Sequence, residues 1–161
     1  MSPHYETVHT VADYYDGPRE GIANFGGAPH AYRCVFDEAA NDWSDVFLLH
    51  PVDDETLQLA LEDWRIWRRW EREFHEGRVT VHSHSALPED RRRHEQLTRI
   101  LEARLRFSPV GALQAKADFR GAVSSPDTPG IMRPLLVRWT VIKQADSDEA
   151  TRRESIYEDH N

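Results

Sequence analysis

Residues 52–77 constrain the fold more than any other segment, because they have the pattern of one long helix with no Gly or Pro before its last residue. Asp53 is placed to accept a backbone N–H at the start of this helix, and Asp54 adds negative charge to the first turn. Gly77 can adopt the left-handed conformation that ends a helix. We therefore expect a helix of about six turns over residues 53–76.

The apolar face of this predicted helix is unusually wide. At about 100° per residue its apolar side chains cover an arc of roughly 220°, which is more than the stripe of an ordinary surface helix. Such a helix is expected to be the central core element, packed across a sheet, rather than a cofactor-binding segment. Its apolar residues are Leu57, Leu59, Ala60, Leu61, Trp64, Ile66, Trp67, Trp70 and Phe74.

Two carboxylates, Asp63 and Glu71, fall inside this apolar arc. A buried carboxylate costs free energy unless it is paired. Each of the two therefore either has a partner from another segment or lines a cleft that admits water and ligand. A structural role, as a salt bridge or as the acceptor of a tryptophan indole N–H, is the favoured interpretation.

The N-terminal third of the chain has the alternating pattern of short β-strands. Its candidate strands cover residues 8–15, 21–25, 30–36 and 46–50. Gly, Pro, Asn and Asp separate these runs, as in an antiparallel meander. The strongest strand pattern lies near the C-terminus, at residues 135–142, and we expect this strand to return to the meander.

Further helices are expected between the long helix and the last strand. Residues 78–85 alternate like a strand, and the segment from Pro88 to about residue 106 has a narrow apolar stripe typical of a helix. Ser108 and Pro109 are placed to begin a third, shorter helix. The predicted fold class is therefore α+β: an N-terminal antiparallel β-meander plus a C-terminal strand form one sheet, packed against the long Trp-rich helix and two further helices.

Length and composition set the outer limits. With 161 residues, of which 39% are hydrophobic and 30% charged, the chain fits one domain over residues 1–143 and a polar, flexible tail over residues 144–161. No apolar run approaches the ~20 residues needed to cross a bilayer, and the N-terminus lacks a secretory signal, so a cytoplasmic bacterial protein without membrane contact is expected. The net charge of −8 argues against a nucleic-acid-binding surface.

The first candidate site consists of His82 and His84. Residues two apart in an extended strand point to the same side, so both imidazoles could bind one metal ion. A third ligand would be needed, and the nearest candidates are His75, Asp90 and His94. No other metal-binding motif is present, so an exposed linker with incidental histidines is favoured, and no cofactor is predicted.

The second candidate site is a cleft between the meander and the long helix. Aromatic walls with a few polar groups are typical of small-molecule sites, although an ordinary contact between a sheet edge and a helix has the same composition. No sequence motif identifies a nucleophile with its base. The candidate lining residues are Tyr15, Arg19, His30, Tyr32, Asp63 and Glu71.

The third candidate is a surface for a protein partner or for a second copy of the chain. Trp43 lies in an acidic loop, where an exposed tryptophan would mark a contact site, although packing back onto the core is favoured. The single cysteine, Cys34, cannot form an internal disulfide and is expected to be a packed thiol rather than a nucleophile.

Without a catalytic motif, the sequence favours a non-enzymatic binding or regulatory protein that acts through protein contacts. The alternative is a small-ligand-binding protein or an enzyme that uses the cleft, with or without a metal at His82 and His84. The two carboxylates discriminate between these hypotheses. Burial of Asp63 and Glu71 against arginines would remove the main residues of the cleft, whereas a concave pocket around them would favour it.

Overall fold

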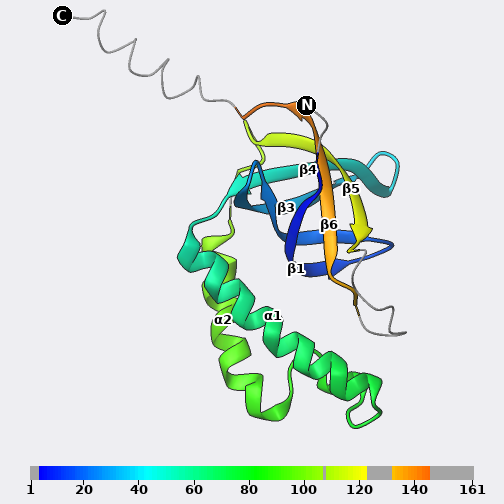
Figure 1. The fold of residues 1–161 in the computed structure, drawn as a ribbon, viewed down its shortest axis with the longest axis vertical. Helices are drawn as coiled ribbons and strands as arrows, with labels where there is room; N and C mark the ends of the chain where they lie inside the picture. The colour runs from blue at the N-terminus through cyan, green and yellow to red at the C-terminus, as the bar shows by residue number, and fades with distance from the viewer. Residues whose placement is uncertain (1–3, 107, 123–131, 146–161) are drawn as a thin grey trace, which may run out of the picture.

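The main body of the protein is a closed six-stranded antiparallel β-barrel (Figure 1). The computed structural model describes residues 4–106, 108–122 and 132–145. Each strand pairs with its neighbours in the chain, and the last strand closes the barrel on the first, where Val137 lies opposite Glu6. The strands are β1 (Glu6–Tyr14), β2 (Pro18–Phe25), β3 (Ala28–Asp37), β4 (Asp42–Pro51), β5 (Leu113–Gly121) and β6 (Leu135–Lys143).

A pair of helices is inserted between β4 and β5. The helices α1 (Asp54–His75) and α2 (Arg91–Arg104) run side by side below the barrel in Figure 1 and are joined through two single-turn 3-10 helices, η1 (Val81–Ser83) and η2 (Pro88–Asp90). Asp53 begins α1 as predicted, because its carboxylate accepts a hydrogen bond of 2.8 Å from the backbone N–H of Thr56. None of the described helices is both long and apolar enough to cross a lipid bilayer.

Side chains from the strands themselves fill the barrel. Alternate residues of a strand point to opposite faces, so one set from each strand points inward. The centre is an aromatic cluster whose ring centroids lie 5.7–6.1 Å apart, formed by Tyr32, Phe47, Phe119 and Trp139. The indole N–H of Trp139 donates a 2.9 Å hydrogen bond to the Asn24 carbonyl, so this buried polar group is satisfied.

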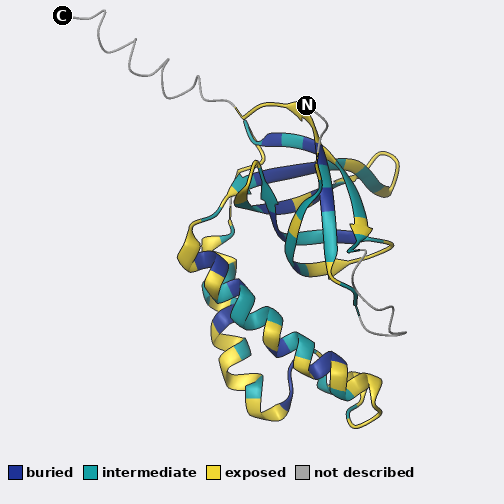
Figure 2. Cartoon of the chain, viewed as in Figure 1, coloured by how far each residue is buried: buried dark blue, intermediate teal, exposed yellow. Residues whose placement is uncertain are grey.

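The helix pair contacts the outside of the barrel and also has a core of its own. Ile22 of β2 points out of the barrel and packs against Leu57 and Ala60 of α1. A second cluster lies between the helices. Figure 2 shows the buried residues of α1 interspersed with exposed ones. Two ion pairs also join the antiparallel helices, Glu55–Arg104 and Glu62–Arg93, and a third joins Arg69 of α1 to Asp90 of η2, directly before α2.

The predicted α+β fold is wrong. An open sheet packed across the long helix was expected, but the sheet closes into a barrel and the helices lie outside it. The third helix predicted after Ser108 is instead strand β5, which pairs with β4 on one side and β6 on the other. Leu113 and Ala115 are buried at period two, and this pairing overrides the helix preference of a segment rich in Ala, Gln and Lys.

Two further predictions differ from the structure or lie outside it. Residues 78–85, predicted to be extended, contain the 3-10 helix η1 instead of a strand. The predicted flexible tail over residues 144–161 lies outside the described residues from residue 146 onward.

Gly21→Ala is expected to destabilise the protein by about 3 kcal/mol. Gly21 lies opposite Tyr32 in the β2–β3 ladder, and a Cβ there would collide with the Thr10 carbonyl oxygen and lie 2.6 Å from the Tyr32 hydroxyl oxygen. In the matched control Gly121→Ala, the nearest atoms belong to the flexible guanidinium of Arg133, so a loss below about 1 kcal/mol is expected. Urea denaturation measures both losses, and equal values would contradict this account.

Candidate functional site

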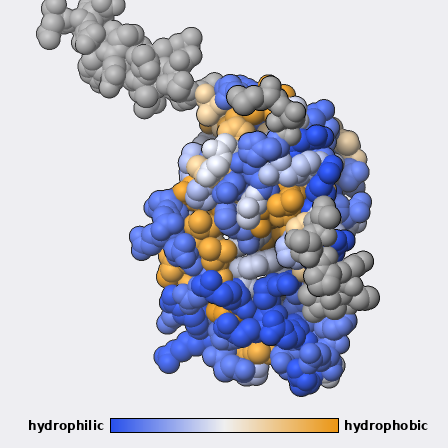
Figure 3. Space-filling view, in the orientation of Figure 1, coloured by the Kyte–Doolittle hydropathy of each residue, from blue (hydrophilic) through white to orange (hydrophobic). Residues whose placement is uncertain are grey.

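A cavity of about 450 Å³ lies between the outer wall of the barrel and the helix pair. Strands β1, β2 and β3 form one wall, and α1, α2 and the segment between them form the other. In the space-filling view the helix pair is mostly hydrophilic, and hydrophobic surface gathers nearer the barrel (Figure 3). A concave site between two structural units is a common location for small-molecule binding.

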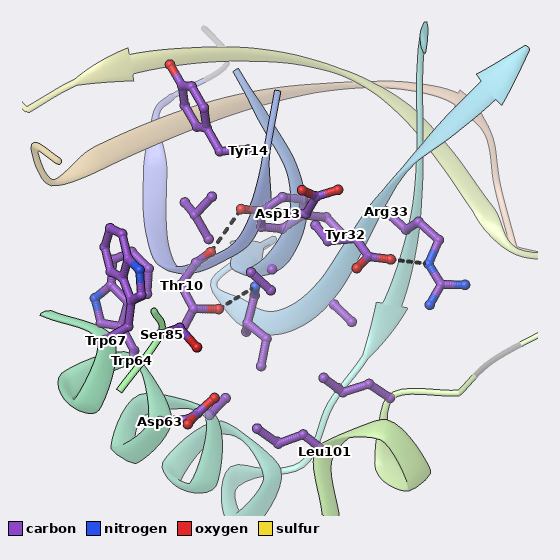
Figure 4. A pocket seen from close by; sticks show the side chains of 18 of the residues that line it. Thr10, Asp13, Tyr14, Tyr32, Arg33, Asp63, Trp64, Trp67, Ser85 and Leu101 are labelled. Carbon is purple, nitrogen blue, oxygen red and sulfur yellow. Dashed lines mark hydrogen bonds and ion pairs between the residues drawn. The ribbon is translucent and has the colours of Figure 1, made fainter. Parts of the chain in front are cut away.

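Two tryptophans of α1 form the aromatic wall of this cavity. Trp64 and Trp67 are stacked with ring centroids 5.0 Å apart and an interplanar angle of 27°. They are three positions apart in the sequence, so their side chains lie on the same face of the helix. Both are partly buried, and Figure 4 shows them together at one side of the cavity. They therefore offer flat apolar surface to a ligand.

The barrel side of the cavity is held by buried hydrogen bonds. The Tyr32 hydroxyl donates to the Thr10 carbonyl at 2.9 Å, and the Thr10 hydroxyl oxygen accepts from the Ile22 backbone N–H at the same distance (Figure 4). Gly21 permits this arrangement, because any larger residue would occupy the space of the Tyr32 hydroxyl. Burial strongly raises the pKa of Tyr32, so its hydroxyl stays protonated and remains a donor.

A chain of three polar side chains lies on the helix side of the cavity. Asp63 Oδ1 is 2.7 Å from His94 Nδ1, and His94 Nε2 is 3.1 Å from Ser85 Oγ. The Asp63 and His94 side chains are 23% and 26% exposed, so they are neither fully buried nor free in solvent. All three residues line the cavity. The carboxylate, the imidazole and the hydroxyl thus form one series of contacts, with the imidazole in the middle.

The helix pair explains how these three residues meet. Asp63 comes from the middle of α1 and His94 from the first turn of α2, and the antiparallel packing of the helices brings them together. Ser85 lies in the connection, directly before Ala86, which is 1% exposed in the core between the helices. Burial of its neighbour therefore anchors Ser85 beside α2.

The cavity wall carries more carboxylates than guanidinium groups. The lining includes three carboxylates, Asp13, Glu20 and Asp63, and one guanidinium, Arg33. Arg33 Nε donates to Glu20 at 2.7 Å, so these two opposite charges are paired. The remaining carboxylates make the site unfavourable for anions.

The predicted cleft residues are only partly brought together. Tyr32 and Asp63 line the cavity, whereas Tyr15, Arg19 and His30 are not among its lining residues. Tyr15 is 67% exposed in the β1–β2 turn, and Arg19 donates to its carbonyl. His30 packs edge-on against Phe25, with its Nδ1 atom 2.8 Å from the Ala28 carbonyl oxygen.

Glu71, the second carboxylate within the apolar arc of α1, is buried in an ion pair. It is 6% exposed and accepts hydrogen bonds from the Arg68 guanidinium at 2.7 Å and from the Met132 backbone N–H at 2.9 Å. These contacts satisfy the buried carboxylate and connect α1 to the segment before β6. Glu71 is not among the cavity residues. The two carboxylates therefore have different environments, one in a cavity and one in an ion pair.

The two histidines proposed as metal ligands lie around the single turn η1. His82 is inside this turn and His84 follows it, so the strand geometry that would align their rings is absent. His84 instead packs edge-on against Trp70 at a centroid distance of 4.7 Å and lines the cavity. Among the described residues, no group of three His, Cys, Asp or Glu side chains is arranged to hold a metal ion.

The remaining predicted residues, Trp43 and Cys34, are not among the lining residues of the cavity. Trp43 packs edge-on against Phe36 and lies 5.3 Å from the Arg19 guanidinium, so the tryptophan folds back onto its neighbours. Cys34 is buried, and its thiol is 3.2 Å from the Ser44 carbonyl oxygen. Burial raises the pKa of this thiol, and a hydrogen bond from Arg19 opposes only part of that effect.

Sequence reasoning missed Ser85 altogether and considered His94 only as a third metal ligand. No motif connects them with Asp63, because the three residues come from two helices and their connection. The available signal was the charge pattern, in which Glu62 on one helix and Arg93 on the next could pair across the interface. That pairing indicates that the two helices pack together over these turns, where Asp63 also contacts His94.

Glu71→Ala is expected to destabilise the protein by about 2 kcal/mol, because it removes the partner of a partly buried arginine and leaves the Met132 N–H without its acceptor. The matched control is Glu55→Ala, whose side chain is 72% exposed in its pair with Arg104 and whose loss should cost no more than about 0.5 kcal/mol. Urea denaturation at neutral pH measures both. Equal losses would contradict a structural role for Glu71.

Cys34 is expected to react with a disulfide reagent such as DTNB at least ~100-fold more slowly in the native protein than in denaturant, because the thiol is buried and its pKa is raised. The control is Ser108→Cys, which adds a second thiol at an exposed position. One fast and one slow thiol are expected in this variant. Rapid native reaction of Cys34 in the unmodified chain would show that its site is open to solvent.

Comparisons of the chain with protein-family models, with curated proteins and with solved structures found no match. The geometry of the chain itself is therefore the basis for a functional proposal. Its strongest element is the cavity between the barrel and the helix pair.

Proposed function

We propose that the protein binds a small, mainly apolar molecule, neutral or cationic, in the cavity between the barrel and the helix pair. The observation that carries this proposal is a cavity of about 450 Å³ walled by a stacked tryptophan pair. That volume suits a ligand of one to three rings, within the usual range of small-molecule sites. The proposal corresponds to the second of the two functions inferred from the sequence, the ligand-binding cleft.

The walls of the cavity support an apolar ligand. Trp64 and Trp67 supply aromatic surface from α1, and Leu101 and Leu105 add aliphatic surface from α2 and its end. Aromatic rings bind flat ligands through buried area and through stacking geometry. The excess of carboxylates over guanidinium groups disfavours an acidic ligand.

Action through protein contacts, the function that the sequence favoured first, stays a prediction. Trp43 packs against Phe36, so it is a poor anchor for a partner. Tyr14 and Tyr15, at 58% and 67% exposure, are better placed at the end of β1. The cavity is the more specific feature, because it combines a defined volume with defined chemistry.

The proposal is tested with two dyes that share one aromatic skeleton. N-phenyl-1-naphthylamine is neutral, and 8-anilinonaphthalene-1-sulfonate carries a sulfonate on the same rings. We expect the neutral dye to bind in a 1:1 complex and at least ~10-fold more tightly than the anionic one, because the cavity wall is acidic. Fluorescence titration measures both affinities. Preference for the sulfonate would contradict the proposal.

Trp67→Ala is expected to weaken binding of the neutral dye by about 10-fold, because it removes half of the stacked pair. Trp43→Ala is the matched control, since it removes a tryptophan that does not line this cavity. Isothermal titration calorimetry avoids interference from the changed fluorescence. If the control variant lost as much affinity, the dye would be bound elsewhere.

A further inference from the structure

We propose that Ser85 is a nucleophile for acyl transfer, with His94 as its general base and Asp63 as the residue that positions the imidazole. The inference rests on the proposed function, because the reacting ester has to occupy the same cavity. Its basis is geometric: Asp63 Oδ1 to His94 Nδ1 is 2.7 Å, and His94 Nε2 to Ser85 Oγ is 3.1 Å. These are the distances and the atom order of an activated serine.

The hydrogen-bond directions follow from the chemistry of the three groups. A carboxylate only accepts, so His94 Nδ1 carries the proton and donates it to Asp63. The neutral imidazole then has its lone pair on Nε2, which accepts the hydroxyl hydrogen of Ser85. Asp63 thus selects the tautomer in which His94 can take a proton from Ser85.

The reaction balances with water as the only co-reactant. Ser85 Oγ bonds to the ester carbonyl carbon while its proton passes to His94 Nε2, and the bond to the alcohol oxygen then breaks as His94 returns that proton to the leaving alcohol. Water attacks the acyl-serine and gives its proton to His94, and the acid leaves as the Ser85 hydroxyl is restored. One ester and one water yield one acid and one alcohol.

The cavity specifies the class of ester. Ser85, Trp64 and Trp67 line the same cavity (Figure 4), so an apolar or aromatic part of the substrate packs on the indoles while its carbonyl reaches the hydroxyl. Asp13 on the opposite wall, which lies outside the Arg33–Glu20 pair, and Asp63 beside His94 disfavour a carboxylate or phosphate on the substrate. The expected substrates are neutral or cationic carboxylic esters.

A purely structural role is the competing explanation. Two ion pairs already join α1 to α2 and a third joins α1 to Asp90 of η2, and each combines a carboxylate with an arginine. The contact between Asp63 and His94 differs, because it uses an imidazole, lines the cavity and continues to a hydroxyl. A contact that only joined α1 to α2 would not require the hydroxyl of Ser85.

The test treats the full-length protein with an uncharged alkyl fluorophosphonate, which transfers its phosphonyl group to an activated serine and releases fluoride. Intact-mass and peptide mass spectrometry locate the adduct. We expect one adduct per chain, on Ser85, and competition by N-phenyl-1-naphthylamine. Ser108→Ala, a change at an exposed serine outside the cavity, should react within about twofold of the unchanged protein.

The roles of the other two residues are tested by rates. His94→Gln and Asp63→Asn should each slow adduct formation at least ~100-fold, the latter because an amide no longer selects the tautomer. The urea midpoint of each variant is measured in parallel. Slow labelling at an unchanged midpoint supports a positioning role for Asp63, whereas labelling at the normal rate would overturn it.

The outcomes separate this inference from the proposed function. If the neutral dye binds but no adduct forms on Ser85, or adducts form only on other serines, acyl transfer is excluded and ligand binding stands. If neither dye binding nor an adduct is found, both proposals fail. Turnover of p-nitrophenyl butyrate that is lost in Ser85→Ala would add the complete reaction to the labelling result.

Discussion

Closure of the sheet is the constraint on which the rest of the structure depends. Once β6 pairs with β1, the strands supply their own core, and the aromatic cluster around Tyr32 and Trp139 occupies the interior. No inward face then remains for a helix to cover, so the helix pair packs on the outer wall through Ile22. The cavity lies at that contact, where a cylindrical helix pair meets a curved barrel.

Local features of the sequence predicted the elements better than their assembly. Asp53 begins the long helix because its carboxylate caps Thr56, an interaction within four residues. The barrel, in contrast, depends on β5, where Leu113, Ala115, Ala117 and Phe119 recur at period two among strong helix formers. That segment becomes a strand because β4 and β6 both pair with it. The local helix or strand preferences of its residues do not reveal such long-range pairing.

The candidate site was predictable to a similar extent. The sequence identified Asp63 and Glu71 as carboxylates inside an apolar helix face. Their different environments depend on residues far away in the chain, because Asp63 contacts His94 and Glu71 contacts Met132. Arg19 and His30 belong to the correct sheet but lie outside the cavity, because strand register determines which side chains face the helices, and Tyr15 lies in the turn after β1. A single sequence does not specify that register.

The insertion of the helix pair has an evolutionary consequence. Leu49, near the end of β4, lies opposite Leu113, at the start of β5, so the inserted segment leaves and re-enters the barrel at adjacent points. The barrel ladders on either side of this entry are complete without the helices. Substitutions on the inner faces of α1 and α2 can thus accumulate while the strands keep their pairing. A chain of this design can change its ligand without a change of its barrel.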